Sequence, residues 1–269
     1  IHELPKTNKS FLDYLPTREE REFIFLPVDA TLVLNYIQSI KPKHSTDNDD
    51  ISMFLIHQVA AHIIEPLVHI INLSFSQGIF PDRMKISKVI AIFKGGLSSL
   101  LDNFRGVSLI NCFSKIMERI VYARLMIFLE ERNFFYKYQF GFRKNHSTQH
   151  AILSLMNKVT EALSNNKLAM VVLLDIRKCF DMVDRNILLI KLEHYGIRGK
   201  CLDWFRSYFS GRSQRMFFNG LNSSKLVQIL LGVLQGSVLG VLLFLIFIND
   251  IGNSCPNLIS FLFADDNAS

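Results

Sequence analysis

Two adjacent carboxylates, Asp265 and Asp266, end a short apolar run that begins at Phe261. Carboxylates are rarely buried unless they are paired or bind a metal ion. A strand with two carboxylates at its tip therefore indicates a divalent-cation site, although a solvated turn can have the same composition. The metal-site interpretation needs a further carboxylate and a phosphate-binding surface elsewhere in the chain.

Asp175 is a candidate for that further carboxylate. It ends the apolar run 169–175, which is typical of a strand buried on both faces. If this strand and the one from Phe261 lie side by side, their tips bring the carboxylates together. Two Mg²⁺ ions ~3.5–4 Å apart could then clamp the attacking and leaving oxygens of a phosphoryl transfer. Mg²⁺ prefers oxygen ligands and retains several waters. Lys94 and Arg105 could hold a triphosphate.

The composition is that of a folded, basic chain. It has 269 residues, 49% of them apolar, and a net charge of +6. The positive charge is concentrated between residues 82 and 144, a segment that contains twelve Lys and Arg but only five Asp and Glu. Such a segment is typical of a polyanion-binding surface or of a solvated basic face. The four cysteines show no C-x-x-C spacing, which favours a reduced, intracellular protein. The first residue is Ile, so we expect a fragment.

Apolar periodicity and capping residues predict several helices. Asp29, Asn111 and Ser147 are candidate caps. The predicted helices are 30–40, a long one from Ile51 that Pro66 interrupts and Gly78 ends, 111–132, one after Ser147 with Ile152, Leu155, Val159 and Leu163 facing inward, and 184–195. The predicted strands are 88–94 and a hairpin of 212–218 with 225–230 around Asn219-Gly220.

The apolar stretch Leu226–Ile248 has two interpretations. Its 23 residues are long enough for a transmembrane helix, and Gly232, Gly236 and Gly240 have the spacing of membrane helix-packing motifs. Alternatively, Gly236-Ser237 is a turn and a helix start that divides the stretch into a strand and a buried helix.

The segment Gln139-Phe-Gly-Phe-Arg143-Lys144 combines aromatic and basic residues. Aromatic rings can stack on bases while Arg143 and Lys144 meet phosphates. The same residues can equally form a packed turn.

Taken in order, these segments resemble the reverse transcriptases of non-LTR (LINE-type) retrotransposons from about Pro66 to Ser269. The segment 80–94 resembles the lead into the fingers of that family. The matching motifs are Phe104-Arg-Gly-Val-Ser-Leu109, Gln139-Phe-Gly-Phe-Arg143, Leu174-Asp-Ile-Arg-Lys-Cys-Phe-Asp181, Gly232-Val-Leu-Gln-Gly-Ser-Val-Leu-Gly240 and Phe263-Ala-Asp-Asp266. The match at 232–248 favours the strand, turn and helix over a membrane span.

The resemblance implies a role for each matching residue. Asp175, Asp265 and Asp266 would bind two Mg²⁺ ions, with Mn²⁺ as an alternative. Phe180 would lie under the sugar and exclude a 2′-hydroxyl, and Gln235 and Gly236 would lie against the base pair of template and nucleotide. Lys94 and Arg105 would meet the phosphates of the incoming nucleotide. Asp181 would be structural, capping the next helix. The implied partners are an RNA template, a DNA primer and deoxynucleoside triphosphates, with no membrane; the sequence indicates no oligomeric state.

The expected fold is α+β. Residues 1–50 would form an N-terminal segment and polar linker, 51–168 helical fingers, and 169–269 part of a palm with a small antiparallel sheet. We expect truncation after the second catalytic motif, without a thumb. The family has Pro at the positions of Gly106, Leu234 and Val241, and the loss of three rigid positions softens the loops. Alternatives are an inactive remnant that binds nucleic acid, a membrane protein anchored by 226–248, and a two-metal nuclease, for which acidic residues are too few.

Overall fold

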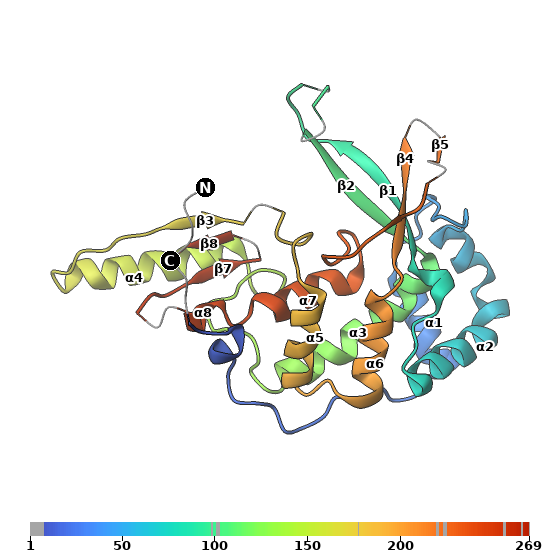
Figure 1. Ribbon diagram of the computed structural model, residues 1–269, viewed down its shortest axis with the longest axis horizontal. Helices are drawn as coiled ribbons and strands as arrows, with labels where there is room; N and C mark the ends of the chain where they lie inside the picture. The colour runs from blue at the N-terminus through green and yellow to red at the C-terminus, as the bar shows by residue number, and fades with distance from the viewer. Residues whose placement is uncertain are drawn as a thin grey trace.

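The computed structural model describes residues 8–97, 99–100, 103–176, 178–218, 221–222, 225–254, 257–264 and 266–268. Helices form the centre of the molecule, and two sheets extend from it on different sides (Figure 1). The helices are η1 Phe11–Tyr14, α1 Ala30–Ser39, α2 Met53–Gln77, η2 Asp82–Lys85, α3 Cys112–Glu130, α4 Thr148–Ser164, α5 Arg185–His194, α6 Gly199–Phe209, α7 Val238–Ile248 and α8 Ile251–Ser254.

The predicted helix starts are confirmed. The side chains of Asp29, Asn111 and Ser147 accept hydrogen bonds from Leu32 N (2.7 Å), Phe113 N (3.0 Å) and His150 N (3.3 Å). These bonds satisfy amides that have no partner inside the first helical turn. Gly78 ends α2 in the left-handed conformation, with φ 69°. The predicted interruption at Pro66 is wrong, because α2 continues through it.

The first sheet has the order β2-β1-β4-β5, with β6 also paired to β4. Its strands are β1 Ile86–Phe93, β2 Phe104–Ile110, β4 Ser213–Phe218, β5 Leu221–Asn222 and β6 Val227–Gln228. β1 pairs antiparallel with β2 and parallel with β4, so that Ile86 lies opposite Ser213. The strand at 88–94 and the hairpin around β4 are therefore confirmed. The predicted turn residues Asn219 and Gly220 lie outside the described residues.

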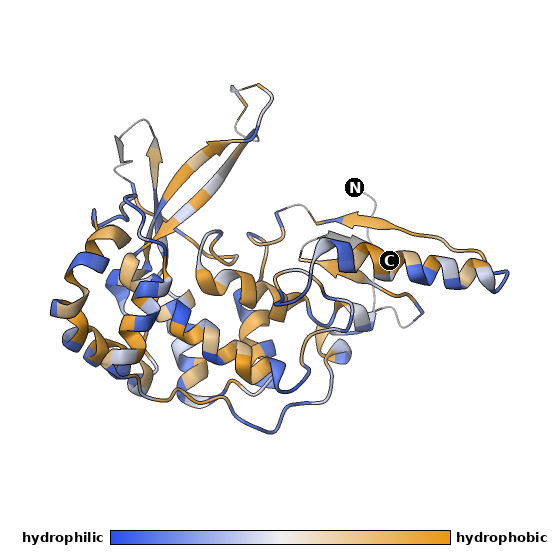
Figure 2. Cartoon of the chain, turned by 180° about the vertical axis from the view of Figure 1, so that it is seen from behind, coloured by the Kyte–Doolittle hydropathy of each residue, from blue (hydrophilic) through white to orange (hydrophobic). Residues whose placement is uncertain are grey.

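The second sheet is antiparallel in the order β3-β8-β7. Its strands are β3 Leu173–Asp175, β7 Phe261–Phe263 and β8 Asp266–Ala268. β7 packs near α4 and is buried at Phe261 and Leu262. The prediction that β3 is buried on both faces is wrong: Leu173 is 78% exposed, and all three residues of this edge strand are exposed (Figure 2). Ile152 and Leu163 of α4 are also exposed, contrary to the predicted inward face.

One apolar core joins α1, α2, α3, α5, α6 and α7. Trp204 of α6 is at its centre with no exposed surface. Its ring stacks on Tyr208 at 5.5 Å, and its indole nitrogen donates to Ser74 Oγ of α2 at 2.9 Å. The single tryptophan therefore fastens α6 to α2.

The stretch Leu226–Ile248 is not a single helix. It contains β6, an irregular segment with a bend at Leu231–Gly232 and a turn at Gln235–Gly236, and the 11-residue helix α7. At 1.5 Å per residue α7 is only ~16 Å long, about half of the ~30 Å hydrocarbon thickness. Among the described residues, α2 is the one helix that meets the length and composition of a membrane span. It packs against α1, α3 and α6, and a core helix meets the same criteria.

Candidate active site

A cleft of about 620 Å³ lies between the first sheet, the turn after β3 and the segment 229–235. Four predicted site residues line it: Lys94, Asp175, Phe180 and Gln235. They come from positions up to 141 residues apart in the sequence. The structure thus brings together a cation, a carboxylate, an aromatic ring and an amide, which suits a phosphate-bearing ligand with a planar base.

The register of the second sheet places Asp175 opposite Asp266. Directly opposed residues of an antiparallel pair are generally ~5 Å apart. The predicted meeting of the two strand ends is thus present at the backbone level. Asp265 lies outside the described residues, as does the side chain of Asp266. Arg105 pairs with Ile92 in the sheet, and its side chain is likewise not described.

The turn after β3 is fastened to the segment that precedes Gln235. Within the turn, Asp181 N donates to Lys178 O at 2.9 Å. Val233 N then donates to Phe180 O at 2.9 Å, and Gly232 N to Val183 O at 2.8 Å. The Phe180 ring stacks on Phe244 of α7 at 4.4 Å. These contacts fix the Phe180 ring at the cleft wall.

Asp181 does not cap the next helix, contrary to expectation. Asp184 is the cap of α5, because its Oδ1 accepts hydrogen bonds from Asn186 N and Ile187 N. Asp181 instead lines the cleft, where its Oδ1 accepts a hydrogen bond of 3.2 Å from Gln235 Nε2. A carboxylate can only accept, so this contact directs the amide nitrogen of Gln235 toward Asp181.

Gly236 lies where the turn meets β2. Ser108 N donates to Gln235 O at 3.0 Å. A Cβ at Gly236 would stand 2.7 Å from Ser108 O, and its φ of 103° also disfavours other residues. Glycine at 236 therefore lets the turn approach the β2 backbone.

The Gln139 segment forms a packed turn against β7. Gln139 is 1% exposed, and its Oε1 accepts from Gly141 N (2.8 Å) and Ala264 N (3.3 Å). A Cβ at Gly141 would be 2.2 Å from Ala264 N, so only glycine fits this approach. This segment thus supports the residue directly before Asp265.

Arg143 and Lys144 are not among the residues that line the cleft. Arg143 is half-buried, with its guanidinium over the Phe135 ring at 5.0 Å and a hydrogen bond to Gln139 O at 3.1 Å. Burial lowers the pKa of Arg143 from its ordinary value. Lys144 is exposed. In this segment Lys144 is the more accessible of the two charges for a polyanion.

Sequence reasoning missed several residues of the cleft wall. Ser108 of β2 and Gln214 and Met216 of β4 line it with the predicted residues. Gln214 and Met216 are two apart on a predicted strand, so the period of two already places them on one face. What the sequence did not contain was the parallel pairing of β4 with β1, which turns that face toward the cleft.

The carboxylate end of the cleft suits a hard cation. Asp175 is exposed and lines the cleft, and the β3–β8 register places a second aspartate opposite it. The described residues contain no group of three or more His, Cys, Asp or Glu side chains that could hold a metal.

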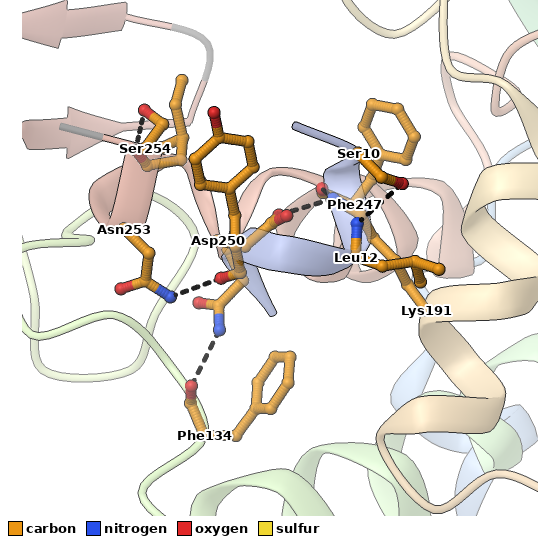
Figure 3. Close-up of polar contacts among 11 residues, drawn as sticks. Ser10, Leu12, Phe134, Lys191, Phe247, Asp250, Asn253 and Ser254 are labelled. Atoms are coloured by element: carbon orange, nitrogen blue, oxygen red, sulfur yellow. Dashed lines mark hydrogen bonds and ion pairs between the residues drawn. The ribbon is translucent and has the colours of Figure 1, made fainter. Parts of the chain in front are cut away.

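A smaller cavity of about 320 Å³ lies behind the same turn. Ile176 and Cys179 line both the cavity and the cleft. At its edge Lys191 of α5 is hydrogen-bonded to Asp250, just beyond α7, as Figure 3 shows. Burial lowers the pKa of Lys191, and the contact with Asp250 opposes that shift. This buried ion pair fixes α5 against the end of α7.

Comparison with known proteins finds relatives for the part of the chain that forms the cleft. Residues 92–268 match the family described as reverse transcriptase (RNA-dependent DNA polymerase). The chain is 31% identical over 229 residues to the RNA-directed DNA polymerase from mobile element jockey of Drosophila funebris, covering 84% of this chain and 25% of that protein. It is 28% identical over 254 residues to a probable RNA-directed DNA polymerase from transposon BS of Drosophila melanogaster, covering 91% and 27%.

The chain spans about a quarter of the length of these two relatives. The family match nevertheless covers well over half of the chain and includes every residue that lines the cleft except Val89. The chain therefore belongs to the reverse transcriptase (RNA-dependent DNA polymerase) family and is homologous to the polymerases of non-LTR retrotransposons.

Proposed function

We propose that this chain forms the nucleotide-binding and metal-binding part of a polymerase that joins deoxynucleotides to a DNA primer on an RNA template. The observation that carries the proposal is the single cleft that gathers Lys94, Asp175, Phe180 and Gln235. The family match supports nucleic acid and nucleotides as ligands, because the family acts on them.

Each cleft residue has a role in this proposal. Asp175, Asp265 and Asp266 hold two Mg²⁺ ions, which when bound neutralise phosphate charge and lower the pKa of the primer hydroxyl. Lys94 and Arg105 bind the phosphates of the incoming nucleotide. The Phe180 ring, supported by Phe244, occupies the space that a 2′-hydroxyl would need.

Gln235 and Gly236 lie against the nascent base pair in the proposal. The contact from Gln235 Nε2 to Asp181 holds the Gln235 side chain at the cleft wall. Arg143 and Lys144 contact the nucleic-acid backbone outside the cleft. The exposed Lys144 is the stronger candidate of the two for an ionic contact.

The proposed architecture assigns residues 51–168 to fingers and 169–269 to a palm, after an N-terminal segment of residues 1–50. The β1–β2 hairpin would close over the nucleotide, and the β3-β8-β7 sheet would carry the carboxylates. An intracellular location fits the buried thiols of Cys112 and Cys201.

Primer extension tests the proposal. The purified chain is given an RNA template, an annealed DNA primer, deoxynucleotides and Mg²⁺, and Asp175→Asn is compared with the unmutated chain. We expect the substitution to lower the extension rate by at least ~10³-fold, because it removes a charged ligand of ions that stabilise several kcal/mol of transition-state charge.

Asp184→Asn is the matched control. It makes the same chemical change on the other side of the turn, where asparagine remains a good helix cap. Its extension rate should stay near that of the unmutated chain. Absence of extension by the unmutated chain, or an unchanged rate in Asp175→Asn, would contradict the proposal.

A further inference from the structure

Glu118 of α3 is a fully buried carboxylate outside the cleft. Its Oε2 accepts hydrogen bonds from Val238 N (2.9 Å) and Leu239 N (3.2 Å), the first two residues of α7. Its Oε1 contacts the hydroxyls of Ser114 (3.0 Å) and Tyr208 (3.1 Å). Glu118 therefore binds the backbone directly after the Gln235–Gly236 turn.

Arg185, the first residue of α5, holds the other side of the turn. Its guanidinium donates to the carbonyl oxygens of Gly232 (2.9 Å), Ile229 (2.5 Å) and Leu231 (3.2 Å). A fourth bond reaches Phe209 O at 2.9 Å. Burial, followed by the nearby Arg212, lowers the pKa of Arg185 to about 10, so the group remains charged at neutral pH.

The two charges match the two kinds of backbone group. Amides at the start of a helix carry partial positive charge, which suits a carboxylate. Carbonyl oxygens that converge from an irregular segment suit the five-donor fork of arginine. Burial raises the pKa of Glu118, while Arg212 and the Leu239 amide oppose that shift. The turn lies between these anchors, and on its third side Ser108 N binds Gln235 O.

We propose that Glu118 and Arg185 are positioning residues that fix the Gln235–Gly236 turn in the cleft by binding the backbone on either side of it. The proposal rests on the proposed function, since it assigns the turn a part in nucleotide binding. Neither side chain is among the residues that line the cleft, so both act through the turn.

Hydrogen exchange of the free protein, followed by mass spectrometry, measures how firmly Glu118 and Arg185 hold the backbone beside the turn. This measurement does not depend on catalysis. Glu118→Gln keeps the shape but removes the charge, so the amides of residues 238–240 should exchange about tenfold faster, since a charge-assisted bond is about twice as strong as a neutral one. Arg185→Lys keeps the charge but loses the fork, so Gly232 and Val233 should exchange faster by a similar factor.

Two controls separate positioning from ordinary core packing. Ser114→Ala removes one hydroxyl contact of the same carboxylate, from Ser114 Oγ to Glu118 Oε1, and leaves the α7 amides untouched. Arg132→Lys changes another arginine that donates to a backbone carbonyl, Phe128 O, at the far end of α3. Both controls should keep unmutated exchange rates in residues 229–240, even where the unfolding midpoint falls.

Steady-state primer extension then connects the anchors to nucleotide binding. We expect Glu118→Gln and Arg185→Lys to raise the KM for deoxynucleotide about tenfold with little change in kcat, while Ser114→Ala leaves KM unchanged. Exchange at 229–240 that stays within about twofold of the unmutated chain in both variants would overturn the proposal. So would faster exchange with an unchanged KM.

A failure of the proposed function can be distinguished from a failure of this proposal. If the unmutated chain extends no primer, that function is wrong, and the exchange rates alone decide whether the anchors hold the turn.

Discussion

At the scale of single residues, the close approach of Gly141 to Ala264 leads to a prediction. Gly141→Ala places a methyl group 2.2 Å from Ala264 N, directly before Asp265. We expect a loss of about 1–3 kcal/mol in the free energy of unfolding, typical of forced overpacking. The rate of primer extension should fall by more than the loss of stability explains, because a displacement of Ala264 also displaces the carboxylates that follow it. Urea unfolding and extension rates measure the two effects.

The matched control is Gly211→Ala. Its φ of 63° makes alanine unfavourable there, but no atom lies within 4 Å of the added methyl group. It should cost stability of about 1–2 kcal/mol by backbone strain and leave extension unchanged. Equal loss of extension in both variants would mean that the Gly141 contact does not position the aspartates.

Phe180 leads to a second prediction, on sugar selection. Phe180→Val should raise the ratio of ribonucleotide to deoxynucleotide incorporation, measured as kcat/KM, by about tenfold or more, the range for a single steric contact. Phe244→Leu removes the ring on which Phe180 stacks but retains Phe180. That variant should lose stability and relax selection less. An unchanged ratio in Phe180→Val would remove Phe180 from the sugar site.

At the scale of elements, the caps of α3 and α4 should contribute different amounts to the free energy of unfolding. Asn111 is 5% exposed, caps α3, and also donates to Asp49 Oδ2 at 3.0 Å. Asn111→Ala should lower the free energy of unfolding by about 1–2 kcal/mol. Ser147→Ala at α4, which has no fully buried side chain, should fray one turn and cost about 0.5 kcal/mol or less. Urea unfolding compares them, and equal losses would contradict this ranking.

The success of sequence reasoning at this scale follows from the range of the interactions. Asp29 caps α1 by reaching an amide three residues away, so the local sequence contains the whole signal. Glu118 acts across 120 residues to Val238, and Gln139 across 125 residues to Ala264. No local pattern encodes these contacts. The apolar run of β3 was misread for a related reason: a hydrophobic sequence shows what prefers burial, and the surrounding elements decide whether it is covered.

At the scale of the whole molecule, buried protonated groups predict a loss of stability in alkali. Burial, then Asp47, raises the pKa of Cys112 to about 12, and burial raises the pKa of Cys201 to about 11, from 9.0. Above pH 9 the unfolded chain releases these protons while the folded chain keeps them. The free energy of unfolding should therefore fall between pH 9 and 11 by up to ~1.4 kcal/mol per pH unit for each group.

Urea unfolding at pH 7.5, 9 and 10.5 measures this slope. Cys201→Ala should lower stability at every pH, because it leaves a small void, but should flatten the decline above pH 9. The same slope in both proteins would show that Cys201 does not titrate on unfolding.

The basic middle of the chain predicts salt-dependent nucleic-acid binding. Affinity for an RNA–DNA duplex should fall linearly on a plot of log K against log salt, because bound phosphates release counterions. Lys144→Gln should reduce the slope by about 1. A fluorescence anisotropy titration at several salt concentrations tests this, with Lys158→Gln as the control, since Lys158 is paired with Glu161 at 2.7 Å. An affinity independent of salt would contradict the basic-surface interpretation.

The single tryptophan, where α6 contacts α2, also provides an intrinsic fluorescence probe. Trp204 is shielded from water and stacked on Tyr208, so its emission should lie at short wavelength and shift to the red when the helices separate. That signal comes from one point in the helical core, whereas circular dichroism averages over the whole backbone. Melting curves from the two spectroscopies that fail to superimpose would reveal that part of the backbone does not unfold together with the helical core around Trp204.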